Sequence, residues 1–265
     1  MSAEAILAGI AAGGTARLLV IAAHPDDETI GLGALLCRNP DSAVLHVTDG
    51  APRDGRDAAR HGFASVEDYA LARRREALAA LAIAGIPEER VLTLGIADQQ
   101  TTLHLVPVAH RLTEAIHALR PDIVVTHAYE GGHPDHDAVA FAVRAALRAL
   151  RSPPPLAEMT GYHAGPRGLE AGRFLPPEER AFAFPLGQEE AAKRRMLDAY
   201  ATQRAVLSAF PLRTEWLRPA PEADFAQPPH PGTLFYEGHD WNMDGAMFRA
   251  LAAAAQQGLG PMPWR

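Results

Sequence analysis

The most constraining feature of this 265-residue sequence is the alternation of short apolar runs with longer helical patterns between residue 17 and about residue 150. The apolar runs lack the polar alternation of a half-exposed strand, which is typical of strands buried on both faces of a sheet. Helical segments between such strands favour parallel pairing. We therefore predict a doubly wound, mostly parallel α/β sheet. Its expected strands are residues 18–22, 43–47, 91–94 and 123–126, and its expected helices are 29–38, 66–84, 106–119 and 137–150.

The pattern changes after residue 150, where Pro and Gly become frequent. Two further helical patterns occupy residues 188–210 and 244–257, and short strands are expected at 159–163 and 181–184. Five prolines within 218–232 predict an ordered loop. Because no repeat or disordered linker is apparent, we expect a single domain over residues 1–265. Its core covers about 15–150, and an elaborated C-terminal extension covers about 151–265.

Composition excludes several classes of protein. The single cysteine, Cys37, rules out an intramolecular disulfide framework and any multi-cysteine zinc site. A formal net charge of -7 provides no overall basic field, so we expect no nucleic-acid partner. No apolar stretch reaches the roughly 18–20 residues of a membrane span. The apolar residues 5–12 follow Glu4, and no Lys or Arg precedes Arg17, which favours a short helix and a cytoplasmic location over a signal peptide.

Two clusters of His and Asp lie where an open α/β sheet binds its ligands. The first, His24-Pro25-Asp26-Asp27-Glu28, comes directly after the first strand. The second, residues 133–137 with the sequence HPDHD, follows the fourth strand and a short glycine loop. Ligands of doubly wound sheets bind outside the carboxyl ends of the strands, at the point where the strand order reverses. We expect the clusters to converge there if their two strands are neighbours.

These residue types suggest a metal and a hydrolytic reaction. A catalytic zinc takes three protein ligands from His and carboxylate and keeps one position for water. His24, Asp27 and one histidine of the second cluster form such a set, and Asp26 would act as general base on the metal-bound water. The remaining histidine would stabilise an oxyanion, oriented by Asp135. Turn formation and helix capping also use Pro and Asp, but two copies at two strand ends favour a site.

The two clusters together resemble the paired signature of the LmbE-like, or PIG-L, deacetylase family. The resemblance extends to Thr48-Asp49-Gly50 after the second strand and to Arg73-x-x-Glu76 on an alanine-rich helix, so it covers roughly residues 17–150. Members of this family are zinc-dependent N-deacetylases of N-acetylglucosaminyl conjugates and related amides, built on a Rossmann-like sheet. The ordered series of motifs is far more specific than any one of them.

The resemblance implies a role for each residue of the two clusters. It makes Asp26 the base and His133 the partner of the oxyanion, with Asp135 behind it. It implies zinc (Zn2+) as the cofactor, although ligands of this kind also accept Fe2+ and other divalent ions. The implied metal ligands are His24, Asp27 and His136.

Four further residues are candidate substrate contacts. Arg53 follows the second strand, and Arg73 matches a family motif, although each is equally explained by a solvated or helix-surface position. Some family members carry a mobile tyrosine just before the second cluster, and Tyr129 lies further upstream than that position. His230, in a proline-rich loop, would reach the site only as part of a lid.

We therefore predict removal of an acetyl group from an N-acetylated amino sugar or related amide. The substrate is a small molecule or glycoconjugate, recognised by the C-terminal extension, and the resemblance also allows a homo-oligomer. Two alternatives keep the site: hydrolysis of another amide or an ester, and a non-catalytic metal- or sugar-binding protein. A dinucleotide-binding oxidoreductase would use Gly31-Leu32-Gly33, but a third glycine is missing and the acidic residues 26–28 would repel a pyrophosphate.

Overall fold

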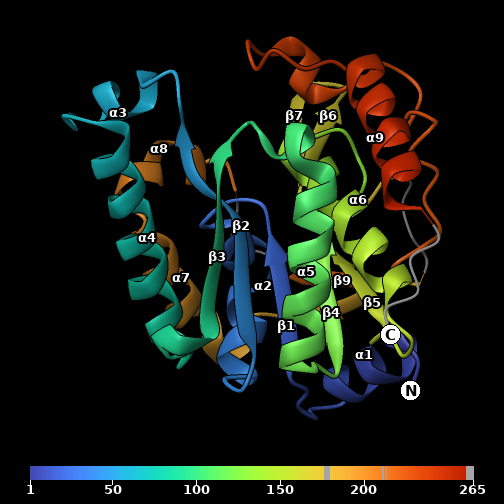
Figure 1. The fold of residues 1–265 in the computed structure, drawn as a ribbon. Helices are drawn as coiled ribbons and strands as arrows, with labels where there is room; N and C mark the ends of the chain where they lie inside the picture. Colours follow the sequence, from blue (N-terminus) through green and yellow to red (C-terminus); the bar gives the residue numbers. More distant parts are fainter. Residues whose placement is uncertain (176–179, 211, 213, 261–265) are drawn as a thin grey trace.

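A twisted sheet of seven strands organises the computed structural model, which describes residues 1–175, 180–210, 212 and 214–260 (Figure 1). The strand order is β3-β2-β1-β4-β5-β9-β8. The first five strands in this order are parallel, and β9 and β8 are antiparallel additions. The strands of this sheet are β1 (Leu18–Ala22), β2 (Ala43–Pro52), β3 (Val91–Asp98), β4 (Ile123–His127), β5 (Leu156–Met159), β8 (Phe182–Phe184) and β9 (Glu215–Pro219).

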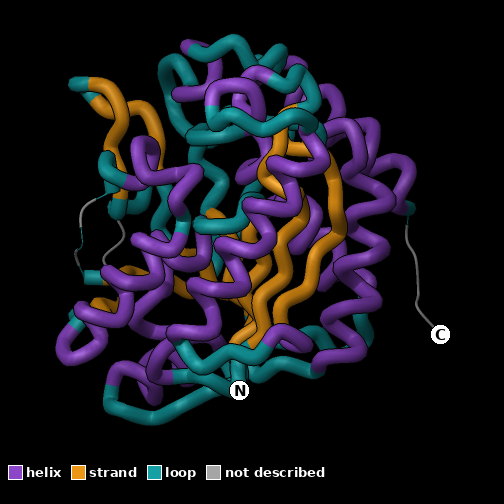
Figure 2. The backbone as a smooth tube through the Cα atoms, turned by 90° about the vertical axis from the view of Figure 1, so that its left-hand side faces the viewer, coloured by secondary structure: helices purple, strands orange, loops and turns teal. Residues whose placement is uncertain are grey.

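Helices cover both faces of the sheet, and a hairpin of β6 (Tyr162–Gly165) and β7 (Gly168–Ala171) stands apart from it (Figure 2). The α-helices are α1 (Ala3–Ala11), α2 (Asp27–Arg38), α3 (Arg56–Arg60), α4 (Val66–Ile83), α5 (Leu105–Leu119), α6 (Pro134–Ala149), α7 (Glu190–Ala199), α8 (Arg204–Leu207) and α9 (Gly245–Leu259). Single 3-10 turns are η1 (Glu88–Arg90), η2 (Thr101–His104), η3 (Gly187–Glu189), η4 (Ala201–Gln203) and η5 (Phe235–Gly238).

Strand β1 lies in the middle of the molecule and contributes to two cores. Because successive side chains of a strand point to opposite faces, Leu18 and Val20 pack with α1, α2, α4 and α7, whereas Leu19 and Ile21 pack with α5, α6 and α9. Each of these four residues is at most 1% exposed. The continuously apolar sequence of β1 thus reflects burial on both faces, and the predicted doubly wound fold is confirmed.

The strand order places the two sequence clusters side by side. Strand β1 pairs with β2 on one side and with β4 on the other, so the order reverses between β1 and β4. The first cluster follows β1 and the second follows β4. The carboxyl ends of these two parallel neighbours therefore bring the clusters to the same edge of the sheet.

The C-terminal part departs from the predicted elements. The expected strand at 159–163 is divided between β5 and β6, and the expected helix at 188–210 is divided between α7 and α8. Strand β9 was not expected, because Glu215 and Arg218 give it a charged sequence. Both side chains are buried in ion pairs, Glu215 with Lys193 at 2.7 Å and Arg218 with Glu158 at 2.7 Å. Pairing of buried charges therefore hides this strand from a hydrophobicity pattern.

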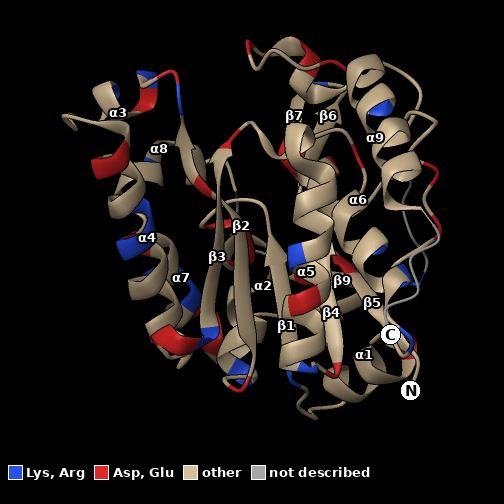
Figure 3. Cartoon of the chain, viewed as in Figure 1, with Lys and Arg blue, Asp and Glu red and all other residues tan. Residues whose placement is uncertain are grey.

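Charged residues of both signs occur on the outer helices. On α4, acidic residues lie near the beginning and arginines toward the middle (Figure 3). This mixed distribution fits the modest net charge of -7. Among the residues that the structure describes, no helix has both the length and the apolar composition needed to cross a membrane.

Candidate functional site

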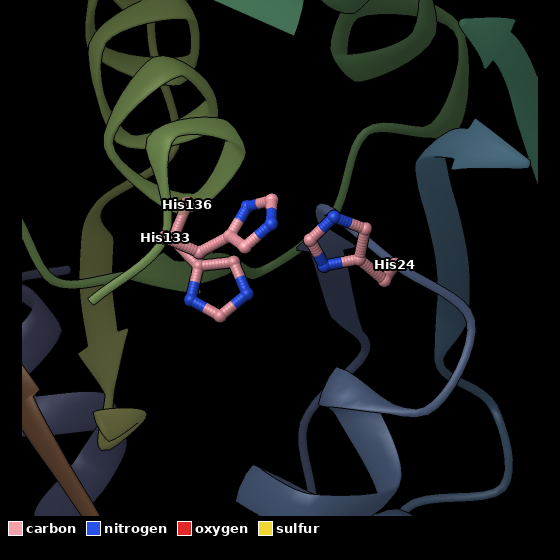
Figure 4. Close-up of side chains that lie close together, drawn as sticks. All are labelled: His24, His133 and His136. Carbon is pink, nitrogen blue, oxygen red and sulfur yellow. The ribbon is translucent and has the colours of Figure 1, made fainter. Parts of the chain in front are cut away.

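The two clusters are positioned by strand-to-helix connections at neighbouring strand ends. Residues 23–26 connect β1 to α2, whose first residue is Asp27. His133 is the N-cap of α6 and Pro134 its first residue, a position that suits proline because no backbone N–H is needed there. The rings of His24, His133 and His136 face one another across these connections (Figure 4). The predicted convergence of the two clusters is therefore confirmed.

The carboxylate of Asp27 lies between two of these histidines. Its Oδ2 is 3.3 Å from His24 Nδ1, and its Oδ1 is 3.2 Å from His136 Nε2. All three residues are at most 8% exposed. Burial opposes the charge of Asp27, but His136 and His127 hold its pKa well below the usual value. An ionised carboxylate thus faces two imidazole nitrogens in a site nearly closed to water.

The donor set fits a divalent cation. His136 Nε2 is buried and has no partner in hydrogen-bonding geometry, although Asp27 is close by. A lone pair left in this way beside a carboxylate is costly unless a cation satisfies both groups. One ligand atom each from His24, His133 and His136 lie within 4.8 Å of one another, as do ligand atoms of Asp27, His127 and His136. Two imidazoles and a carboxylate are a usual ligand set for catalytic zinc.

Asp98, at the end of β3, belongs to the site and was missed in the sequence. Its Oδ1 lies 3.0 Å from His24 Nε2, and Asp135 Oδ2 lies 3.2 Å from the same nitrogen. Burial disfavours charge on His24, but these carboxylates raise its pKa well above the usual value. Because two carboxylates contact Nε2 of His24, its other ring nitrogen, Nδ1, is the one that faces Asp27. Such carboxylate–histidine contacts commonly orient a metal ligand.

The carboxylate of Asp135 therefore differs from its expected position behind His133. It accepts hydrogen bonds from the backbone N–H groups of Gln99 (2.6 Å) and Thr101 (2.9 Å), in addition to its contact with His24. These bonds tie the loop after β3 to the start of α6. The contact between Asp135 and His133 is instead made by the backbone, since the Asp135 N–H donates to His133 Nδ1 at 3.1 Å.

That backbone bond determines the tautomer of His133. Because Nδ1 accepts a hydrogen bond, the neutral ring carries its proton on Nε2. Burial lowers the pKa of His133 well below the usual value, and the neighbouring His24 adds to this effect. In this structure His133 is therefore a neutral hydrogen-bond donor through Nε2.

His127, the last residue of β4, is the second site residue missed in the sequence. Its ring stacks on that of His136, with centroids 4.0 Å apart, and its Nε2 lies 3.5 Å from Asp27 Oδ2. The backbone N–H of Ala23 donates to the same Nε2 at 2.9 Å, so this lone pair holds the first connection in place. The signal in the sequence is a histidine directly after residue 126, where the predicted strand ends.

Asp26 lies beside the metal candidates and in contact with Arg73. Arg73 donates to Asp26 Oδ2 (3.3 Å) and to the carbonyl of Pro25 (2.8 Å), and both side chains are buried. Burial raises the pKa of Asp26 to about 7, and Arg73 acts in the opposite direction. Arg73, a candidate substrate contact, thus lies in the site and holds the carboxylate of Asp26.

Glu28, the last residue of the first cluster, supports the connection that carries Asp26. Its fully buried carboxylate accepts from Tyr200 OH (2.6 Å) and Thr29 Oγ1 (2.8 Å) and lies 2.9 Å from His46 Nε2. It also accepts from the backbone N–H of Asp26 at 3.2 Å. Asp26 has a φ of 133°, a conformation costly for a residue with a side chain. Glu28 therefore helps to hold the strained connection.

Three of the four candidate substrate contacts have partners outside the histidine cluster, and Tyr129 is the first. The N–H groups of the next two residues, Glu130 and Gly131, donate to Asp137 Oδ1. The Tyr129 ring packs on Phe225, with centroids 4.6 Å apart, and its hydroxyl donates to the carbonyl of Gln227. The Tyr129 hydroxyl is thus bonded to Gln227 in this structure, and its role as a substrate contact stays a prediction.

His230 and Arg53 are also engaged elsewhere. His230 is half-buried, and its Nδ1 lies 2.9 Å from the carbonyl oxygen of Pro231, with no described contact to the histidine cluster. Arg53 pairs with Asp49 and donates to the carbonyl of Ala51 at 2.6 Å. Local turn geometry explains the position of His230. An i,i+4 ion pair explains that of Arg53.

The fold and the site together define a class of protein. It is a doubly wound α/β protein with a buried cluster of histidines and carboxylates, a candidate cation site, at the switch point of the sheet. The cluster lies beside a carboxylate, Asp26, whose pKa is about 7. Such a combination is suited to metal-assisted hydrolysis.

Comparison with known proteins places the chain more narrowly. Residues 19–147 match the model of the PIG-L family, described as GlcNAc-PI de-N-acetylase. A probable N-acetyl-alpha-D-glucosaminyl L-malate deacetylase 2 of Bacillus subtilis is 34% identical over 142 residues, covering 51% of this chain and 60% of that protein. A 1D-myo-inositol 2-acetamido-2-deoxy-alpha-D-glucopyranoside deacetylase of Saccharopolyspora erythraea is 28% identical over 242 residues, covering 71% of this chain and 77% of that protein.

Solved structures agree on the fold. A deacetylase from the teicoplanin biosynthesis pathway superposes with a TM-score of 0.61 at 21% identity, covering 78% of this chain and 99% of that one. The chain spans about 60% of the length of the Bacillus relative that it matches. The match to the PIG-L family lies in residues 19–147, just under half of the chain.

Proposed function

We propose that this protein is a zinc-dependent deacetylase that hydrolyses the acetamide of an N-acetylated amino sugar. The observation that carries the proposal is the ionised Asp27 between His24 and His136, next to a separate carboxylate, Asp26. Metal-assisted hydrolysis needs a cation site and a base at one place. Here Asp26 and Asp27 are adjacent in the chain, and His136 joins them from α6. The deacetylases among the relatives support the choice of acetamide as the scissile group.

The residues proposed to hold the metal are His24, Asp27 and His136. A divalent ion bound there would polarise the acetamide carbonyl and make water more acidic. Asp98 and Asp135 would keep His24 oriented through its Nε2, at 3.0 and 3.2 Å. Zinc is a usual ion for this ligand set, which also accepts Fe2+ and other divalent ions.

Asp26 is proposed to move the proton. With a pKa near 7 its carboxylate accepts a proton from the attacking water as the water oxygen bonds to the carbonyl carbon. His133 donates a hydrogen bond from Nε2 to the oxyanion that forms on the carbonyl oxygen. Asp26 then returns its proton to the amide nitrogen as the C–N bond breaks, which releases acetate and the free amine. Arg73 holds Asp26 in place throughout.

The proposal is tested by metal content and acetate release measured on the same preparations. We expect about one zinc per wild-type chain after reconstitution, loss of the metal in His136→Ala, and retention in the control His104→Ala, an exposed histidine outside the cluster. Asp26→Asn should keep its metal while acetate release from N-acetylglucosaminides falls by about a hundredfold or more. Near-normal turnover in Asp26→Asn would refute its role as base. Absence of bound metal in the wild-type protein would refute the proposal as a whole.

A further inference from the structure

Six aromatic rings form a closed series of contacts that begins and ends on the histidines of the site. Neighbouring ring centroids along the series are 4.4 to 5.5 Å apart, and the contact between His133 and His136 closes it at 5.4 Å. We call this set the aromatic circle. In order of contact its members are His133, Trp241, His239, Phe235, Tyr162 and His136.

Four members of the aromatic circle come from the C-terminal part, outside the segment that matches the family model. None of the four is fully buried, although Trp241 packs against the hydrophobic core. The neighbouring Leu234, Tyr236 and Met243 are buried, whereas Phe235 and Trp241 remain half-buried and His239 is exposed. The chain therefore anchors this segment with buried residues and leaves the rings between them partly exposed beside the site.

The segment that carries three of these rings is held in place by hydrogen bonds. The carboxylate of Glu237 accepts from the backbone N–H groups of Leu234 and Gly245, both at 2.9 Å. The backbone N–H of Phe235 donates to the carbonyl of Gly131 at 2.8 Å, which ties the segment to the loop before His133. Because these positions are fixed before a ligand arrives, little ordering is needed on binding.

Among the residues that the structure describes, no lysine or arginine makes a cation–π contact with a ring of the aromatic circle. Arg56 contacts Asp240, which lies between two members of the circle in the chain, at 3.2 Å, and it also pairs with Asp54 at 3.2 Å. An anionic group on the substrate would therefore find no guanidinium or ammonium partner on the outer rings of the circle, whereas a flat apolar face could stack on them. The ligand chemistry that suits the surface is uncharged, planar and apolar.

We propose that the aromatic circle is a substrate subsite that binds a flat apolar face next to the acetamide, and so selects uncharged glycosides over anionic conjugates. The inference rests on the proposed function, since it assigns the acetamide to the histidine site. Two parts of a substrate can supply such a face: an aryl group attached to the sugar, or the C–H face of the pyranose. Trp241 has the largest ring in the circle and is the residue through which the subsite is best tested.

Binding is measured first, without turnover. Zinc-loaded protein is titrated calorimetrically with phenyl and methyl β-glycosides of glucosamine, which lack the acetyl group and cannot be deacetylated. We expect Trp241→Leu to bind the phenyl glycoside about three- to tenfold more weakly than wild type, and Trp241→Phe to restore most of the affinity. Trp216→Leu, which changes a tryptophan on β9 outside the circle, should bind like wild type.

The pattern across ligands identifies the group that stacks. A loss confined to the phenyl glycoside assigns the circle to the aryl group, and an equal loss for both glycosides assigns it to the pyranose. Unchanged affinity for both in Trp241→Leu would overturn the inference. Zinc content of each variant is measured in parallel, so that a disturbed His133 or His136 is not mistaken for a lost stacking surface.

Acetate release then tests selection between substrates. The matching phenyl and carboxymethyl glycosides of N-acetylglucosamine are compared, and we expect a higher kcat/KM for the phenyl glycoside, with the effect of Trp241→Leu mainly on KM. Equal kcat/KM for the charged and uncharged glycosides would refute the selectivity. Absence of acetate release from either glycoside would count against the proposed function, whereas the binding titration would still decide the subsite.

Discussion

Among individual residues, Asp26 has a strained backbone conformation that the surrounding side chains must stabilise. A φ of 133° at a residue with a side chain costs free energy, and here it directs the Asp26 carboxylate at Arg73. Glu28, two residues later, accepts the N–H of Asp26 and is itself saturated by Tyr200 and Thr29. The last residue of the first motif is thus a support for the base.

Replacement of Glu28 by Gln tests this support. A glutamine amide presents N–H donors to side chains that already donate, and it removes the negative charge beside His46, so we expect a loss of about 2–4 kcal/mol in the free energy of unfolding. Acetate release should fall as well. Urea unfolding provides the measurement, with Glu67→Gln on the exposed side of α4 as the control. A change below about 0.5 kcal/mol, which is typical of exposed positions, would show that the hydrogen bonds of Glu28 do not stabilise the fold.

Among elements, the decisive contact joins the connection before α6 to the start of β6. The backbone of Gly132 lies so close to Tyr162 that a Cβ atom at this position would be 1.9 Å from the Tyr162 carbonyl oxygen. Strand β6 belongs to the C-terminal part, yet its first residue packs tightly against the connection that positions His133. The geometry of the second motif therefore depends on an element that follows it in the chain.

Gly132→Ala should separate these two segments. Because the clash is with backbone, the connection must move, and we expect a loss of about 1–3 kcal/mol in stability together with a fall in acetate release. Thermal unfolding and activity are compared with those of Gly238→Ala, where a Cβ would meet nothing within 4 Å. Wild-type stability and activity in Gly132→Ala would contradict the close packing of Gly132 on Tyr162.

At the scale of the whole molecule, the cation site joins distant parts of the chain. Asp27 begins α2, His136 lies in the first turn of α6, and Asp98 ends β3. A cation bound by such residues stabilises the folded state, because the unfolded chain does not bring them together.

Zinc should therefore raise the unfolding temperature of the wild-type protein. At a free concentration one hundred times Kd, binding to the native state alone adds about 2.7 kcal/mol. Differential scanning calorimetry with and without zinc measures the shift, which we expect to disappear in His136→Ala and to persist in His104→Ala. An equal shift in His136→Ala would place the stabilising ion at another site.

Much of this arrangement could be predicted from the sequence because its signals are local. The apolar run 18–22 is buried on both faces and identified the central strand, and the HPDDE and HPDH motifs identified two strand ends. Strand β9 could not be identified in this way, since Glu215 and Arg218 are neutralised by partners more than twenty residues away. Buried ion pairs leave no periodic trace in a sequence.

The sequence alone determined the class of fold, the edge of the sheet that carries the site, and the chemical types of its ligands, because hydrophobic period and strand-end motifs act over a few residues. Only the tertiary structure decided which groups meet there. It brought Asp98 and His127 into the cluster, gave the carboxylate of Asp135 to His24, and turned Tyr129 toward Phe225. Side-chain partners depend on packing between strands and loops that lie far apart in the chain, and that packing is a property of the folded molecule.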